Sequence, residues 1–89
     1  MGTEVKGGNS YRNISSSTLI KSSSGSLCGI FVASTTAGTV KLWDQTSAAA
    51  PILVNTHTIL PGWNPMPFDF SNGLYITVAG TLDCTVSYS

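Results

Sequence analysis

The last seventeen residues decide the fold of this chain: Gly73-Leu-Tyr-Ile-Thr-Val-Ala-Gly-Thr-Leu-Asp-Cys-Thr-Val-Ser-Tyr-Ser89. Apolar and polar side chains alternate in two runs, 74–79 and 82–88, and a period of two predicts strands with one buried face. Gly80-Thr81 separates the runs, and glycine accepts the positive φ of a tight turn. The stretch therefore predicts a β-hairpin that closes the domain. Its expected inward-facing residues are Leu74, Ile76, Val78, Leu82, Cys84 and Val86.

Short segments of the same character occur along the rest of the chain. Strands are predicted over 10–21, 26–35, 39–44 and 52–60, and turn residues such as Ser22-Ser-Ser-Gly25, Thr36-Ala-Gly38 and Pro61-Gly62 separate them. A segment at 63–70 contains two prolines, which restricts it to a sheet edge. No segment has a helical period. The prediction is an all-β fold, a single small β-sandwich or jelly-roll-like barrel of six to seven strands without significant helix. Residues 10–89 form this β-sandwich domain, and 1–9, rich in glycine, form a flexible N-terminal arm.

The composition narrows the choice of partner. Only 9% of the 89 residues are charged, the formal net charge is zero, and 13 residues are serine. Without a basic stripe to hold phosphates, no nucleic-acid partner is expected. No apolar run approaches the length of a membrane span, and no signal-peptide pattern opens the chain, so no membrane partner is expected and synthesis is placed in the cytoplasm. Cys28 and Cys84 fit that compartment as thiols, with a disulfide between them as the less favoured alternative.

The supply of catalytic groups is small. His57 is the single histidine, no serine lies in a Gly-x-Ser-x-Gly motif, and the two cysteines and His57 share no metal-ligand spacing. The chain is therefore predicted not to be an enzyme and to need no cofactor or metal. His57 is expected to be an exposed strand residue.

One predicted strand is apolar on both faces. Alternation puts Leu27, Gly29 and Phe31 on one side and residues 28, 30 and 32 on the other. Only one side packs inside a single sandwich, and a domain this small has a thin core that partner subunits often reinforce. The second side is therefore expected to contact another subunit.

A cluster of aromatic residues and prolines lies between 63 and 70. It supports three interpretations: a lid over one end of the core with Phe68 and Phe70 inward, a protein-contact surface, or a sugar site in which Trp43 or Trp63 stacks on a pyranose ring. The lid is the most common use of such residues and the sugar site the least common. The candidate protein-contact residues are Leu27, Gly29, Phe31, Trp43, Trp63 and Met66.

Four segments together carry a family resemblance: Gly29-Ile-Phe-Val32, Gly38-Thr-Val-Lys-Leu-Trp-Asp44, Ile52-Leu-Val-Asn-Thr56 and the terminal stretch from Gly73 to Tyr88. Over about residues 17–88 this pattern resembles that of short tailed-bacteriophage proteins. The resemblance implies a small virion component that decorates or cements the capsid or is attached at the neck or tail. Cys28, Cys84 and 63–66 lie outside the shared pattern.

Two classes of function follow. The first is a structural virion protein, made in the host cytoplasm, that binds the major capsid protein or another virion component as a homo-oligomer. A trimer is preferred because threefold sites are abundant on icosahedral shells. The second is a carbohydrate- or receptor-binding module of a neck or tail fibre that uses an exposed tryptophan.

Overall fold

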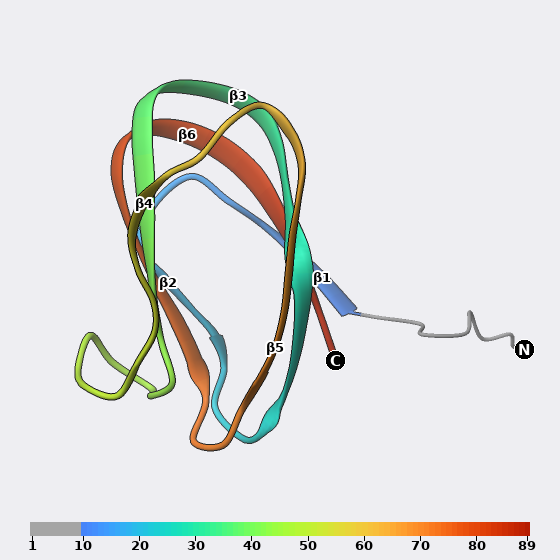
Figure 1. Cartoon of the computed structure of the whole chain (residues 1–89), viewed down its shortest axis with the longest axis vertical. Coiled ribbons are helices and arrows are strands. Elements are labelled where there is room, and N and C mark those ends of the chain that lie inside the picture. The colour runs from blue at the N-terminus through green and yellow to red at the C-terminus, as the bar shows by residue number, and fades with distance from the viewer. Residues whose placement is uncertain (1–9) are drawn as a thin grey trace, which may run out of the picture.

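The computed structural model describes residues 10–89, which form one antiparallel β-sheet (Figure 1). Its six strands are β1 (Ser10–Ile14), β2 (Thr18–Lys21), β3 (Gly25–Trp43), β4 (Ile52–Thr58), β5 (Gly62–Phe70) and β6 (Leu74–Tyr88). Residues 10–89 contain no helix, which confirms the all-β prediction and leaves no helical segment able to cross a membrane. The predicted flexible arm, 1–9, lies outside the described residues.

Two long central strands organise the sheet. β3 and β6 pair with each other along most of their length. β6 also pairs with β2 through its first half and with β1 through its second, while β3 pairs with β5 through its first half and with β4 through its second. Both central strands arch over at the same end of the molecule, so the sheet doubles back and its two halves face each other (Figure 1).

The arch lies where the sequence predicts two turns. Ala37 has φ +54° and Gly80 has φ +79°, and the β3–β6 register shifts between Thr36 and Thr39. The predicted turns at 36–38 and 80–81 are therefore wrong, because both sites are bends within continuous strands. A positive φ bends a strand as readily as it reverses one. Here each run pairs with a distant strand instead of with its neighbour in sequence.

The predicted first strand also differs from the structure. The segment 10–21 is interrupted at 15–17, and β1 and β2 contact different halves of β6. Ser17 anchors the interruption, because its hydroxyl accepts the N–H of Val78 at 2.9 Å. A side chain thus replaces the ladder hydrogen bond that a continuous strand would have supplied.

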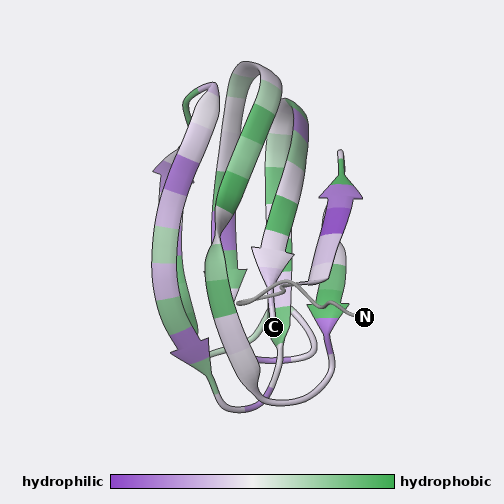
Figure 2. Ribbon diagram, turned by 90° about the vertical axis from the view of Figure 1, so that its right-hand side faces the viewer, coloured by the Kyte–Doolittle hydropathy of each residue, from purple (hydrophilic) through white to green (hydrophobic). Residues whose placement is uncertain are grey.

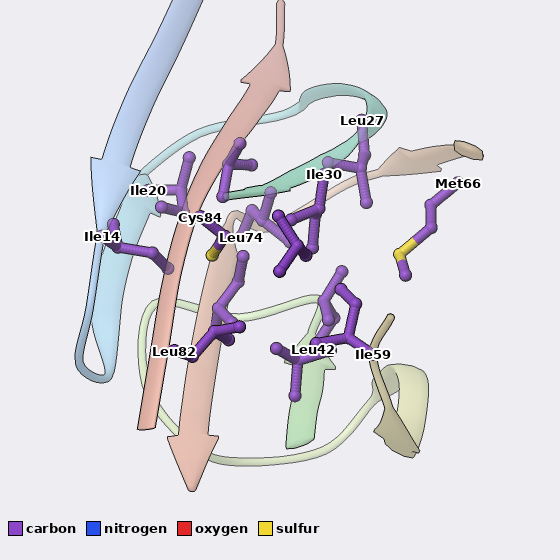
Figure 3. Packing of buried hydrophobic residues seen from close by; sticks show 14 of the residues in the cluster. Ile14, Ile20, Leu27, Ile30, Leu42, Ile59, Met66, Leu74, Leu82 and Cys84 are labelled. Atoms are coloured by element: carbon purple, nitrogen blue, oxygen red, sulfur yellow. The ribbon is translucent and has the colours of Figure 1, made fainter. Parts of the chain in front are cut away.

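The core lies between the two halves of the sheet (Figure 3). Apolar positions alternate with polar ones along the strands (Figure 2). The predicted inward-facing residues of β6 are confirmed: five are buried, and Val78 is partly buried against the core. The buried residues are Ile14, Ile20, Leu27, Ile30, Val32, Val40, Leu42, Ile59, Met66, Phe70, Leu74, Ile76, Leu82, Cys84 and Val86.

A β-bulge corrects the predicted faces of the segment 27–32. The register of β3 shifts between Leu27 and Gly29 against both β5 and β6, so Cys28 is an extra residue in the β3–β6 ladder. An extra residue resets the alternation. Leu27 and Ile30 both point into the core, whereas Cys28 and Phe31 are exposed. Leu27 therefore does not share a surface with Phe31.

The proline-containing strand is an edge, as predicted. β5 pairs with β3, and no second partner is found within the described chain. Phe70 and Met66 point into the core, but Phe68 is 44% exposed. The segment is a strand of the sheet and not a lid over one end of the core, so the lid interpretation is wrong although Phe70 does point inward. His57 lies exposed in β4, as expected.

Candidate protein-contact surface

Two rows of side chains cross the outer surface of one half of the sheet. This half is formed by β1, β5, the first half of β3 and the second half of β6. Residues directly opposite one another in a ladder project to the same face. One row contains Trp63, Phe31, Thr85 and Asn13, and the next contains Pro65, Gly29, Ser87 and Tyr11. We call these eight residues the outer aromatic face.

Three aromatic side chains dominate this face. Tyr11 is 76% exposed, Trp63 52% and Phe31 50%. Phe31 and Trp63 are direct cross-strand partners, an arrangement that favours contact between the two rings. No residue of the outer aromatic face carries a charge at neutral pH. A surface of this composition, aromatic and without charge, is typical of the central part of a protein interface.

Gly29 determines where the indole of Trp63 lies. A Cβ built on Gly29 would stand 2.7 Å from Cη2 and 2.8 Å from Cζ2 of Trp63, and 2.6 Å from the carbonyl oxygen of Asn64. The six-membered ring of Trp63 therefore occupies the space that a side chain at position 29 would fill. It rests against the backbone of β3, and half of the side chain remains in solvent.

Asn64 holds the chain segment that carries Trp63. Its Nδ2 donates to the carbonyl oxygens of Leu60 at 2.9 Å, Gly62 at 3.0 Å and Ile30 at 3.3 Å. These contacts tie the turn before β5 both to itself and to β3. Trp63 is consequently presented from a fixed backbone.

A polar cluster lies at the opposite end of the first row. Asn13 Nδ2 donates to Asp83 Oδ1 at 2.9 Å, to the Cys84 carbonyl at 3.0 Å and to Thr85 Oγ1 at 3.3 Å. The cluster joins the edge strand β1 to β6 beyond the backbone ladder. Asp83 lies outside the two rows, so the nearest carboxylate stands at the rim of the face and not in its centre.

The other half of the sheet presents a different outer surface. Trp43 is half-buried, its Nε1 donates to Thr77 Oγ1 at 3.3 Å, and the ammonium of Lys41 lies 4.4 Å from the ring centroid. Because the lysine covers its ring and Thr77 satisfies its N–H, Trp43 is less available than Trp63 for stacking on a ligand. A small open pocket of about 150 Å³ lies nearby. It is lined by Thr39, Val40, Lys41, Thr56, Thr77, Val78 and Ala79.

The described residues contain no cluster of histidine, cysteine, aspartate or glutamate able to hold a metal ion. The small pocket contains hydroxyls and one lysine, and it does not contain His57. The absence of an enzymatic activity stays a prediction.

The two cysteines lie in different environments. Cys84 is a free thiol in the core, and burial, followed by the nearby charge of Asp83, raises its pKa to about 11. Cys28 is exposed at the bulge. The alternative of a disulfide between them does not hold in this structure.

The six candidate contact residues divide into three groups. Phe31 and Trp63 are exposed side by side, and Gly29 lies beneath Trp63. Trp43 lies on the other half of the sheet. Leu27 and Met66 are core residues, because the bulge turns the first inward and the second lies on the inner face of β5.

Sequence reasoning missed the contribution of β1 to this surface. The alternation of Tyr11 and Asn13 is visible in the sequence, but their place beside Phe31 depends on long-range pairing through Ser87 and Thr85. Nothing local predicts that pairing.

The chain matches no protein-family model, no curated protein and no solved structure.

Proposed function

We propose that this protein is a non-enzymatic structural component of a bacteriophage virion, a decoration or cement protein that binds the capsid shell as a homo-oligomer. The observation that carries the proposal is the outer aromatic face, with Phe31 and Trp63 paired and half-exposed on a rigid sheet. Aromatic, charge-depleted surfaces of this kind are the ones that proteins use to bind other proteins. The motif resemblance supplies the virion context.

Contacts near and between the segments that carry the phage resemblance also support the proposal. Asp44 ends the segment 38–44, and its carboxylate accepts the backbone N–H groups of Ser71 and Asn72, just before Gly73 begins the terminal segment. The segments 38–44 and 73–88 also pair directly as neighbouring strands, with Val40 opposite Val78 and Leu42 opposite Ile76. We take this folded-over sheet as the small β-sandwich, jelly-roll-like domain of such proteins. The partner is the major capsid protein or another virion component, and a trimer is the preferred assembly.

Quantitative mass spectrometry of purified particles tests this function. Phage particles are isolated from cells that carry the gene, and peptides of this chain are compared with those of the major shell protein. We expect a fixed ratio that matches a class of symmetry sites on the shell, and purified protein added to particles that lack it should sediment with them. Its absence from the particles would contradict the proposal.

A carbohydrate- or receptor-binding module of a neck or tail fibre is the second candidate. The observation in its favour is that half of the Trp63 side chain is open to solvent, on a face that also carries the hydroxyls of Thr85 and Ser87 one strand beyond Phe31 and Gly29. Exposed indole rings stack on sugar rings through dispersion and C–H contacts. Quenching of Trp63 fluorescence by soluble glycans, together with a copy number of a few per particle, would favour this candidate over the first.

A further inference from the structure

The turn between β5 and β6 contains the only Asn-Gly dipeptide of this chain, Asn72-Gly73. At such a dipeptide the backbone nitrogen of the glycine can attack Cγ of the asparagine, because glycine has no Cβ to obstruct the approach. A bond forms between that nitrogen and Cγ, and the bond from Cγ to the amide nitrogen breaks. The amide nitrogen leaves as ammonia with the proton that the glycine nitrogen gives up. Water then opens the cyclic imide to aspartate or isoaspartate.

Asp44 holds both groups that this reaction joins. The side-chain Nδ2 of Asn72 donates to the carbonyl oxygen of Asp44 at 3.2 Å, and the backbone N–H of Asn72 donates to Asp44 Oδ1 at 2.8 Å. Burial raises the pKa of the Asp44 carboxyl, but backbone N–H groups of the turn, that of Gly73 among them, hold it below its usual value. The attack requires the Gly73 nitrogen and the Asn72 side chain to approach each other, and their contacts with Asp44 resist this movement.

Gly73 is also packed too closely to move within the folded turn. It is buried, and a Cβ built on it would lie 2.8 Å from the carbonyl oxygen of Lys21 and 3.2 Å from that of Gln45. The backbone of Gly73 is therefore enclosed by the end of β2 and by the loop that follows β3. The reaction requires the turn to leave these contacts, which is a local opening of the structure.

We propose that Asn72 is a deamidation site of this chain and that Asp44 protects it in the folded protein. The inference is independent of the proposed function, because it concerns the turn 71–73 and not the outer aromatic face. The modification also weakens the turn that prevents it. An aspartate at position 72 places a second carboxylate near that of Asp44, and like charges repel. Isoaspartate inserts a methylene group into the backbone, so either product hinders the turn from closing again on Asp44.

Peptide mass spectrometry of the full chain, incubated in mildly alkaline buffer, tests the proposal. The change from amide to acid at position 72 is followed with time in the folded protein and in urea. Folded wild type should react at least roughly tenfold more slowly than the chain in urea, because a turn that opens rarely reacts rarely. Asp44→Ala should speed the reaction of the folded protein roughly 5- to 30-fold, because the hydrogen bonds that it removes keep the turn closed.

Gly62→Ala is the matched control. It destabilises the fold through the backbone conformation of residue 62, φ +101°, but leaves the contacts of Asp44 intact. Its rate at position 72 should stay near that of wild type, whereas a general effect of lower stability would raise it as in Asp44→Ala. Circular dichroism establishes that each variant is folded. If Asp44→Ala does not fold, Asp44→Asn, which keeps the shape of the side chain, takes its place.

Three results would overturn the inference. The first is an Asn72 that reacts as fast in the folded protein as in urea. The second is an equal rate at position 72 in Asp44→Ala and Gly62→Ala. The third is an Asn72 that reacts no faster in urea than the other asparagines of the chain. Particle mass spectrometry is independent of all three, so a failure of this inference is distinguishable from a failure of the proposed function.

Discussion

Gly80 of β6 lies directly against Gly38 of β3 at the arch of the sheet. A Cβ on Gly80 would be 3.1 Å from the Cα of Gly38 and 2.3 Å from the carbonyl oxygen of Ala37. Gly80 also has φ +79°, a conformation that a side chain disfavours. The two backbones can therefore touch at the bend only because Gly80 has no side chain, and this contact lets one sheet enclose its own core.

Gly80→Ala should destabilise the protein by roughly 2 to 4 kcal/mol, because it combines a left-handed backbone with a steric conflict against Ala37. Urea unfolding followed by circular dichroism measures the loss. Gly62→Ala is the control, since Gly62 has φ +101° but no atom within 4 Å of an added Cβ. The control should lose only the conformational part, about 1 to 2 kcal/mol. Equal losses in the two variants would show that the close contact at the arch is not needed.

Gly29→Ala should displace the indole of Trp63. The new Cβ would lie within 2.8 Å of two ring atoms and 2.6 Å from the Asn64 carbonyl oxygen, so either the ring or β5 must move. We expect a loss of about 1 to 3 kcal/mol, as for other overpacked sites. In a Trp43→Phe background the Trp63 emission should move to longer wavelength. An unchanged spectrum at unchanged stability would contradict this position of the ring.

The alternation of side chains predicted much of this structure. In β6 every residue expected to face inward is buried or partly buried, since a half-buried strand forces a period of two on its sequence. The two prolines of β5 likewise predicted an edge strand, because proline has no N–H to donate to a second neighbour.

Pairing and register could not be predicted in this way. Gly80-Thr81 has the composition of a hairpin turn, and only the distant partner strand β3 makes it a bend. Gly29 inside an apolar strand does predict a bulge or a close backbone approach, but only the pairing with β6 shows that Cys28 is the extra residue, which turns Leu27 into the core and leaves Phe31 outside. The outer aromatic face depends on both features, so the sequence identified two of its aromatic residues but neither Tyr11 nor the arrangement of the rows.

Cys84 should be unreactive in the native protein. Burial, followed by the charge of Asp83, raises the pKa of the Cys84 thiol to about 11. Because this pKa is about two units above that of an ordinary thiol, the thiolate fraction at pH 8 is about 100-fold lower. A disulfide reagent should therefore label Cys28 rapidly and Cys84 only in urea. Since the unfolded thiol ionises first, stability should also fall as the pH rises above 9. Rapid labelling of both thiols in the folded chain would contradict the buried position of Cys84.

His57→Ala should change the free energy of unfolding by less than about 0.5 kcal/mol, because the side chain is exposed on β4 and substitutions at such sites have small effects. Association measured by sedimentation should also be unchanged. Any hydrolytic activity of the wild type that this substitution removes would show that the chain has a catalytic site and would contradict the binding function.

Asp44 holds the turn between β5 and β6. Its Oδ1 accepts the N–H of Ser71 at 2.9 Å and of Asn72 at 2.8 Å, and its Oδ2 lies 3.1 Å from the Ser71 nitrogen. Burial raises the pKa of the Asp44 carboxyl, but the backbone N–H groups of Asn72, Ser71 and Gly73 together outweigh burial and hold the pKa below its usual value. The folded protein therefore prefers the charged carboxylate.

This preference predicts how stability depends on pH. A carboxyl whose folded pKa is depressed stabilises the protein above its unfolded pKa of about 4, and the contribution is lost as the pH falls through the lower, folded value. Asp44→Asn keeps the shape but removes the charge, so it should cost about 1 to 2 kcal/mol at pH 7. The difference from wild type should shrink steadily below pH of about 4. Urea unfolding across this pH range measures the difference in stability between Asp44→Asn and wild type.

Asp69→Asn is the control, because the Asp69 carboxylate accepts a hydrogen bond from the Ser26 hydroxyl at 2.7 Å instead of from backbone N–H groups of a turn. If Asp44→Asn and wild type kept the same difference at every pH, the ionised carboxylate would not be what stabilises this turn.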